Sequence, residues 1–339
     1  MSFSSEQDPQ TSFLSLPNGC LCCSILEPGI TAIENMVAQR PEGEKEVDWV
    51  VVELTGVADP AEIAKSFWTN EEMGGMLRLD GVVCVVDTKN IIQQLEEDEK
   101  ANSGNECARQ IAASDVILLN KTDLVQDESA FQQIEQRIAE INPISLFRRT
   151  HRSAVDLSNI FGIGGYSTNE SSENGTKGKA HIPASIQAIA EQRTHEATTD
   201  HAHSHQHVDS SKKHLNGIGS YVFDLPVLSK AQLDSVETFL QALHWKNRIE
   251  GVQSGKANDE QVDERSRLVV LRSKGLFVDT EGDVHVLQGV RDIYELNKLD
   301  VKADDLEEEH PGSKLVVIGR NLGSRDVWLK GLRMTCGLD

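Results

Sequence analysis

The chain has 339 residues, of which 38% are hydrophobic, and this is enough for two domains with ordinary cores. It carries 54 acidic and 33 basic side chains, a formal charge of -21, so its long-range field repels nucleic acids and anionic membranes. The sequence contains neither a long apolar run nor a start typical of a signal peptide. We therefore expect a cytosolic protein that binds neither nucleic acid nor membrane.

A cysteine-rich turn near the start of the chain is the first feature with chemical meaning. A short strand is predicted over residues 12–16, and Cys20, Cys22 and Cys23 follow it in the sequence NGCLCCS. Thiolates favour zinc or copper(I), so the turn is a candidate metal site; the alternative is three buried or incidental cysteines. Three ligands leave a fourth position for water, a carboxylate, a histidine or a partner protein.

Between Phe13 and Leu146, short apolar segments alternate with helical stretches, which predicts a parallel sheet covered by helices. The predicted strands are Val47–Leu54, Gly81–Asp87, Val116–Asn120 and Ile144–Arg148. The first three place a polar residue at the carboxyl edge, where ligands bind in open α/β sheets. These polar residues are Glu53, Asp87 and Asn120.

The first of these strands runs into the sequence ELTGVADP, and a helix is expected after Pro60. In phosphate-binding α/β proteins, an acidic residue in the position of Glu53 reaches magnesium, usually through water. A glycine three residues later, here Gly56, lets its N–H group approach the terminal phosphate. The alternative is an ordinary strand and turn with an incidental carboxylate.

The tetrapeptide NKTD directly follows the predicted strand that ends at Asn120. Asp123 would accept hydrogen bonds from two adjacent guanine N–H groups, which adenine cannot supply. Lys121 would lie over the ring, and Asn120 would hold neighbouring loops. The sequence therefore predicts a guanine-nucleotide site at this edge, the alternative being a chance match of four residues.

Residues 166–214 are rich in Ser, Asn, Gly, Lys and His, which predicts a flexible linker with a short helix near residues 186–192. Six of the eleven histidines lie within residues 195–214. Alternating imidazoles bind zinc, nickel or copper weakly, so this tract either buffers metal or supplies auxiliary ligands. The alternative is a plain polar linker.

A second, smaller α+β domain is predicted over residues 215–330. It begins with a strand at Ile218–Leu225 and a helix capped by Ser229, whose apolar residues recur every three or four positions and face a sheet. Further strands are predicted at Leu268–Arg272, Leu276–Asp279, Val284–Gly289 and Leu315–Gly319.

The order of these motifs resembles the CobW family of metal-handling GTPases, and within it the eukaryotic zinc-regulated GTPase metalloprotein activators. The resemblance extends from NGCLCCS through ELTGVADP, NKTD and the His-rich linker to LQGVRDIYEL (287–296) and KLVVIGRNL (314–322). It implies a CobW-type nucleotide-binding domain over residues 1–165 and a CobW C-terminal domain over residues 215–330. The implied function is a zinc metallochaperone that couples GTP binding and hydrolysis, with magnesium, to zinc transfer to a client metalloenzyme.

The resemblance also implies a client and roles for single residues. In the eukaryotic branch the implied client is methionine aminopeptidase, although the short N-terminal client-docking motif of that branch is absent from this sequence. Glu53 would be the catalytic Walker B glutamate. The zinc ligands would be Cys20, Cys22 and Cys23, and the nucleotide ligands Gly56, Asn120, Lys121 and Asp123.

The phosphate site is where the chain departs from the family pattern. The printed sequence has no GxxxxGK[ST] motif, whose amides and lysine hold the β- and γ-phosphates. The family pattern places a strand, that loop and a helix before the CxCC turn, whereas nineteen residues precede Cys20 here. We therefore expect a P-loop GTPase-like parallel sheet that lacks its first strand and P-loop, and no GTP hydrolysis.

Two explanations of this departure stay open. The sequence is either an incomplete or shortened form of a full GTPase, or a zinc-binding protein that has lost hydrolysis. The retained guanine motif favours the first, because reading a base serves little purpose without binding its phosphates. The alternative function is a non-enzymatic zinc-binding or metal-buffering protein.

Overall fold

The computed structural model describes residues 26–38, 47–56, 58–72, 74–101, 105–125, 127–166, 189, 217–249, 267–306 and 312–338. They divide into two compact units, residues 1–79 and 80–339. The division precedes the predicted linker, because residues after Asp80 share one hydrophobic core with the C-terminal domain.

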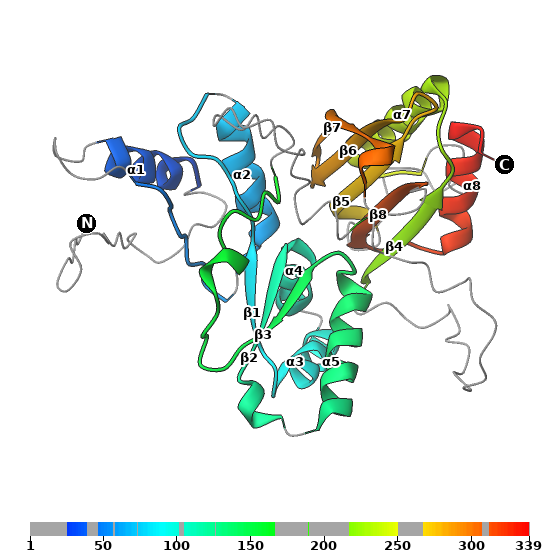
Figure 1. The fold of residues 1–339 in the computed structure, drawn as a ribbon. Helices are drawn as coiled ribbons and strands as arrows, with labels where there is room; N and C mark the ends of the chain where they lie inside the picture. Colours follow the sequence, from blue (N-terminus) through cyan, green and yellow to red (C-terminus); the bar gives the residue numbers. More distant parts are fainter. Residues whose placement is uncertain are drawn as a thin grey trace. The chain divides into compact units, whose positions relative to one another are not determined.

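The described residues of the first unit form two helices, α1 (Leu26–Ala38) and α2 (Pro60–Glu72), drawn in blue in Figure 1. Ile33 of α1 and Phe67 of α2 belong to the same buried cluster. Proline suits the first position of α2 because its missing N–H group would have no partner inside the helix. The helix predicted after the ELTGVADP segment is thus present.

The strand predicted over Val47–Leu54 does not form. The segment has no strand assignment, and its apolar side chains Trp49 and Val51 are 49% and 74% exposed. A strand needs a hydrogen-bonded neighbour, and no strand is assigned among the described residues of the first unit. Val50, Val52 and Leu54 still pack against the core of this unit, so the segment is apolar on one side without forming a strand.

The second unit begins with a parallel sheet of three strands, β1 (Val83–Asp87), β2 (Val116–Asn120) and β3 (Leu146–Arg149). Their order is β1-β2-β3, and both pairs are parallel. This confirms the α/β fold class predicted from the alternating apolar and helical segments. Among the described strands β1 lies at the edge of the sheet, and its Val85 is 58% exposed.

Three helices supply the core on one face of this sheet: α3 (Ile91–Ala101), α4 (Glu106–Ala113) and α5 (Glu128–Ile141). Ile117 and Leu119 point alternate side chains of β2 into this core, and both are fully buried. The opposite face carries a smaller cluster in which Leu118 packs with Ile163.

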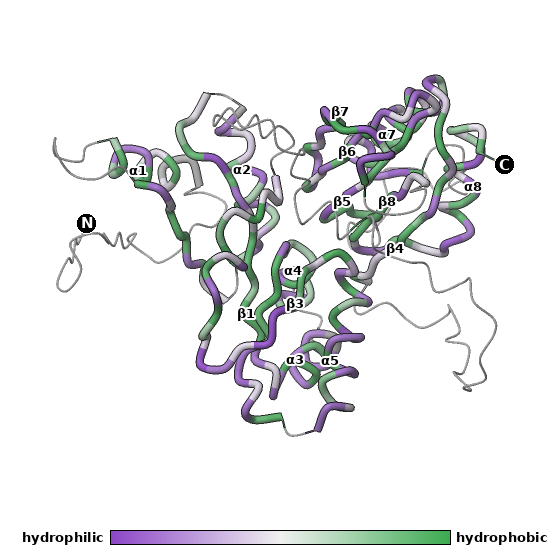
Figure 2. Tube along the Cα trace, viewed as in Figure 1, coloured by the Kyte–Doolittle hydropathy of each residue, from purple (hydrophilic) through white to green (hydrophobic). Residues whose placement is uncertain are grey.

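The C-terminal domain is a five-stranded antiparallel sheet in the order β4-β8-β5-β6-β7. Figure 2 shows hydrophobic colour along much of β4 and alternating colour along α5, as expected for a buried strand and an amphipathic helix. The strands are β4 (Ile218–Leu225), β5 (Val269–Val278), β6 (Asp283–Val290), β7 (Ile293–Lys302) and β8 (Ser313–Arg320).

Two helices, α7 (Lys230–Lys246) and α8 (Arg325–Cys336), pack together over one face of the antiparallel sheet. The predicted cap of α7 is confirmed, since Ser229 and Gln232 form a capping box. Trp328 of α8 is fully buried and donates a hydrogen bond from Nε1 to the Leu322 carbonyl at 2.6 Å. The α+β class predicted for this domain is confirmed.

Three details of this domain differ from the prediction. The strands predicted at Leu268–Arg272 and Leu276–Asp279 are one strand, β5, because Lys274, the charged residue between them, is buried against Asp115 rather than exposed in a turn. β7 was not predicted. Helix α8 extends the domain to Cys336, beyond residue 330 where the prediction ended it.

Several predicted features lie outside the described residues. They are the strand over residues 12–16, the turn with Cys20, Cys22 and Cys23, and the histidine tract at 195–214. Of the predicted linker, residues 166 and 189 are described, and Ile189 is helical and fully buried. In the described part of the chain, no helix is long and apolar enough to cross a membrane.

Candidate functional site

The parallel sheet brings the polar ends of β1 and β2 together. Asp87 and Asn120, the last residues of these strands, are paired in register, and the Thr88 N–H group donates to the Asn120 carbonyl at 3.1 Å. The chain then turns sharply at Lys121, whose φ of 63° lies in the left-handed region. This turn places Thr122, Asp123 and Leu124 in a short 3-10 helix at the carboxyl edge.

Asn120 holds the loop that follows β3. Its Oδ1 accepts hydrogen bonds from the Ser153 N–H group at 2.9 Å and from the Thr150 hydroxyl at 3.2 Å. Its Nδ2 donates to Ser153 Oγ at 2.9 Å, and the Thr122 hydroxyl donates to the Thr150 carbonyl at 3.0 Å. Two loops that are about 30 residues apart in the sequence therefore form one rim of the sheet.

Lys121 lies against Asp87. The ammonium group donates to Asp87 Oδ2 at 2.8 Å, and this hydrogen bond is the main cause that holds the pKa of Asp87 below its ordinary value. The same carboxylate accepts from the Lys89 N–H group at 3.1 Å and from Asn90 Nδ2 at 2.9 Å. Asp87 is thus a fixed anion that orients the long Lys121 side chain across the edge.

Asp123 presents a half-exposed carboxylate at this edge. Its side chain is 49% exposed, and Oδ1 lies 3.5 Å from His151 Nε2. A carboxylate in this position has lone pairs available for two parallel N–H donors, which is the hydrogen-bonding pattern that guanine offers. Lys121 and Asn120 are held by hydrogen bonds at the same edge, and base recognition by Asp123 stays a prediction.

Glu53 and Gly56 belong to the first unit, whereas this rim belongs to the second. Glu53 is exposed in the extended segment of the first unit, and Gly56 lies in a turn where an added Cβ atom would meet nothing within 4 Å. Their predicted roles toward magnesium and phosphate stay predictions, as do the thiolate roles of the cysteine turn.

Sequence reasoning missed the contribution of the loop after β3. Thr150, His151 and Ser153 contact the NKTD residues, yet they match no motif that we used. The available signal was the position of this polar loop after a predicted strand of the same sheet, where its residues must reach the same carboxyl edge.

Metal ligands do not cluster in the described part of the chain. No group of three or more His, Cys, Asp or Glu side chains could hold an ion there. The described thiols of Cys84, Cys107 and Cys336 are poor ligands, because burial raises the pKa of each to about 11 and keeps it protonated at neutral pH. The predicted thiolate site at Cys20, Cys22 and Cys23 lies outside the described residues.

Comparison with known proteins shows the family to which the chain belongs. A model of the CobW/HypB/UreG nucleotide-binding domain matches residues 2–148, and a model of the cobalamin synthesis protein CobW C-terminal domain matches residues 245–333. Zinc-regulated GTPase metalloprotein activator 1 of Schizosaccharomyces pombe is 30% identical over 311 residues, which cover 91% of this chain and 68% of the relative. The chain belongs to the CobW family.

Other CobW proteins extend the match. The protein of the same name from Saccharomyces cerevisiae is 28% identical over 346 residues, covering 96% of this chain and 71% of the relative. Zinc chaperone YjiA of Escherichia coli is 29% identical over 180 residues, covering 53% of this chain and 54% of YjiA. The Zn(II)-bound crystal structure of YjiA GTPase superposes with a TM-score of 0.58 at 23% identity, covering 96% of this chain and 81% of YjiA, which shows the shared fold.

Proposed function

We propose that this chain is a cytosolic zinc metallochaperone that delivers zinc to a client metalloenzyme. The observation that supports the proposal is the rim in which hydrogen bonds hold Asn120 and Lys121 beside the half-exposed carboxylate of Asp123, in a chain of the CobW family. Its relatives named as zinc chaperones or zinc-regulated metalloprotein activators support zinc as the cargo.

The cargo ligands in this proposal are Cys20, Cys22 and Cys23. Three thiolates from one turn bind a soft cation, and an incompletely closed site of this kind releases zinc more readily than a closed four-thiolate site. The fourth position is left for water, a carboxylate, a histidine or a client. Methionine aminopeptidase is the client that we propose from the eukaryotic branch of the family.

Nucleotide binding would gate this transfer. Asp123 would accept from the guanine N–H groups, Glu53 would hold magnesium through water, and the Gly56 N–H group would approach the terminal phosphate. When bound, magnesium neutralises phosphate charge. Because the 339 residues contain no GxxxxGK[ST] motif, we expect them alone to hydrolyse GTP no faster than background.

Zinc titration against a chromogenic chelator tests the cargo site. Replacing Cys20, Cys22 and Cys23 together by Ser should abolish the tight zinc site, whereas Cys107→Ser is the matched control and should leave zinc affinity unchanged. Unchanged affinity in the triple variant would remove the cysteine turn from the proposal.

A fluorescent GTP analogue and a phosphate-release assay test the nucleotide part. Phosphate release above background that disappears in Asp123→Ala would overturn the expected lack of hydrolysis. Asp156→Ala is a suitable control, since Asp156 caps a different 3-10 turn through Ser158.

A further inference from the structure

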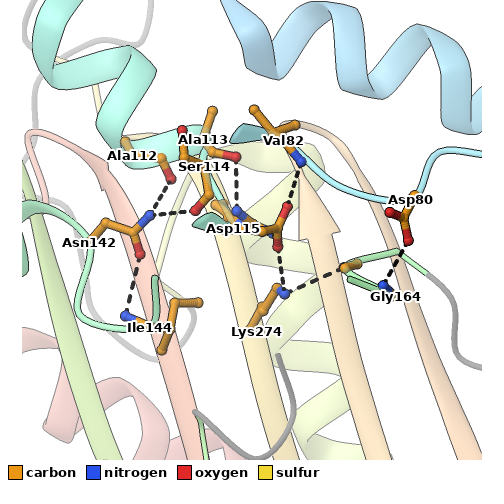
Figure 3. A network of polar contacts seen from close by, with 12 residues as sticks. Asp80, Val82, Ala112, Ala113, Ser114, Asp115, Asn142, Ile144, Gly164 and Lys274 are labelled. Carbon is orange, nitrogen blue, oxygen red and sulfur yellow. Dashed lines mark hydrogen bonds and ion pairs between the residues drawn. The ribbon is translucent and has the colours of Figure 1, made fainter. Parts of the chain in front are cut away.

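A buried ion cluster joins the parallel-sheet part of the second unit to the C-terminal sheet (Figure 3). Asp115 begins the link at the start of β2, and Arg272 and Lys274 of β5 complete it. Arg272 Nη2 and Lys274 Nζ both donate to Asp115 Oδ1, the latter at 3.1 Å. The three side chains are between 2% and 4% exposed, so these contacts are made without water around them.

The side chains of Asp115 and Arg272 also bind backbone atoms at the ends of neighbouring helices and strands. The other oxygen of Asp115 accepts from the Val82 N–H group at 3.0 Å, just before β1. Arg272 Nη1 donates to the carbonyl of Ala113, the last residue of α4, at 2.8 Å. A cation at the carboxyl end of a helix is favourable, because carbonyls there lack partners within the helix.

Residues 163–166 contact the cluster from another side. Lys274 Nζ contacts the Gly165 carbonyl at 3.4 Å, and the Arg272 guanidinium lies 5.5 Å from the centre of the Tyr166 ring. Asp80 fixes these residues, since its carboxylate accepts from the N–H group of Ile163 at 3.2 Å. It also accepts from the N–H group of Gly164 at 2.9 Å (Figure 3).

Charge and packing make this arrangement specific. Burial alone would raise the pKa of Asp115, but the charges of Arg272 and Lys274 more than offset it and hold this pKa below its ordinary value. A buried ion pair contributes little net stability, yet it tolerates few geometries because each charge needs its partner. The apolar core beside it is continuous, with Ile117 of β2 and Ile318 of β8 in one cluster.

We propose that the Asp115–Arg272–Lys274 cluster is a fixed joint that couples the chain entering at Asp80 to the C-terminal sheet. Through it, residues 80–166 and the C-terminal domain move as one body, and a displacement of Asp80–Val82 reaches β5 directly. The same joint anchors the start of β2, whose other end carries Asn120. The proposal does not depend on the cargo or the nucleotide.

Hydrogen exchange on the full chain, followed by mass spectrometry, tests the joint. Asp115→Asn keeps the shape but leaves two buried cations without a counter-ion. We expect exchange in residues 80–82, 163–166 and 269–274 to become faster together, on the order of 100-fold, and the single unfolding transition of the unit to split into two.

Asp283→Asn is the matched control. Asp283 also binds two lysines, Lys298 at 2.6 Å and Lys302 at 2.5 Å, but all three lie on the neighbouring strands β6 and β7. Its effect should be confined to those strands.

Two results would overturn the joint. One is faster exchange in Asp115→Asn that stays near residues 82 and 115 with one unfolding transition; the other is independent unfolding of the two parts in the unaltered chain. If Asp115→Asn does not fold, the same exchange experiment on Lys274→Met tests the joint. This variant should fold, because it leaves Arg272 as one cation for the one carboxylate of Asp115. Faster exchange at residues 163–166 and 269–274 supports the joint in that variant, and unchanged exchange at both overturns it.

Discussion

Replacing Asn120 by alanine should release the loop after β3. The substitution removes three hydrogen bonds, two to Ser153 and one to Thr150. The loop needs these bonds because Arg152 and Ser153 have φ values of 51° and 58°, in the left-handed region that side chains disfavour. Each such residue costs roughly 1–2 kcal/mol, and local contacts must offset this cost.

The size of the effect follows from the bonds that are lost. A hydrogen bond contributes roughly 0.5–1.5 kcal/mol net, and partly exposed bonds lie at the low end of that range. Three of them therefore stabilise the closed loop by about 2 kcal/mol. This free energy corresponds to local opening that is about 30-fold more frequent.

Amide hydrogen exchange at Ser153, measured by NMR, reports this opening. The control is Asn159→Ala, because Asn159 accepts from Arg148 Nε at 2.6 Å in the adjacent loop without touching Ser153. Equal exchange at Ser153 in Asn120→Ala and in the unaltered chain would show that the left-handed backbone is held by something other than Asn120. The structural basis of the candidate base site would then be wrong.

Three further predictions concern pH, the core and the histidine tract. Burial lowers the pKa of Lys274 to about 8 from 10.5, so between these pH values the unfolded chain binds this proton more strongly and the contribution of Lys274 to the free energy of unfolding rises with pH. Denaturant titrations between pH 8 and 10.5 should show this rise as the difference between the unaltered chain and Lys274→Met, because the buried thiols of Cys84, Cys107 and Cys336 act in the opposite direction in both proteins. Trp328→Ala should lower the free energy of unfolding by about 3–5 kcal/mol, as the side chain is fully buried, and calorimetry should find almost no change for Trp245→Ala, whose side chain is 60% exposed. Deleting residues 195–214 should change zinc affinity little; a large loss of bound zinc would instead favour the metal-buffering alternative.

The sequence predicted most accurately those strands whose apolar pattern is clear and whose neighbouring strands lie in the same unit. β2 and β4 have the predicted limits, because each is an apolar run whose neighbours lie within the same unit. The cap at Ser229 was also predictable, since it needs only residues three positions apart. Interactions between residues close in the sequence determine the cap, and continuous apolar sequence determines the limits of the two strands.

Elements that depend on distant partners were missed. The segment 47–54 has the composition of a strand but no strand beside it among the described residues of its unit. β5 was predicted as two strands separated by residues 273–275, whereas Arg272 and Lys274, beside and within that break, are both buried against Asp115, more than 150 positions earlier. β7 alternates moderately exposed residues at the edge of its sheet, so its apolar signal is weak.

The residues of the candidate site also fall into those that a local motif predicts and those that only the fold brings together. NKTD was recognisable as a motif, and the structure adds Asp87 and the loop after β3, which no motif announces. The predicted roles of Glu53 and Gly56, in the first unit, and of the three clustered cysteines, outside the described residues, stay predictions.

The close approach of Gly165 to Asp115 restricts how this protein can diverge. A Cβ atom at position 165 would lie 2.8 Å from the Asp115 carboxyl carbon, so even alanine would push the carboxylate away from its two cations. Position 165 can therefore gain a side chain only together with a smaller residue at position 115 and altered charges at 272 and 274. In related sequences these four positions should vary together, and their covariation would mark the relatives that keep the same connection between their domains.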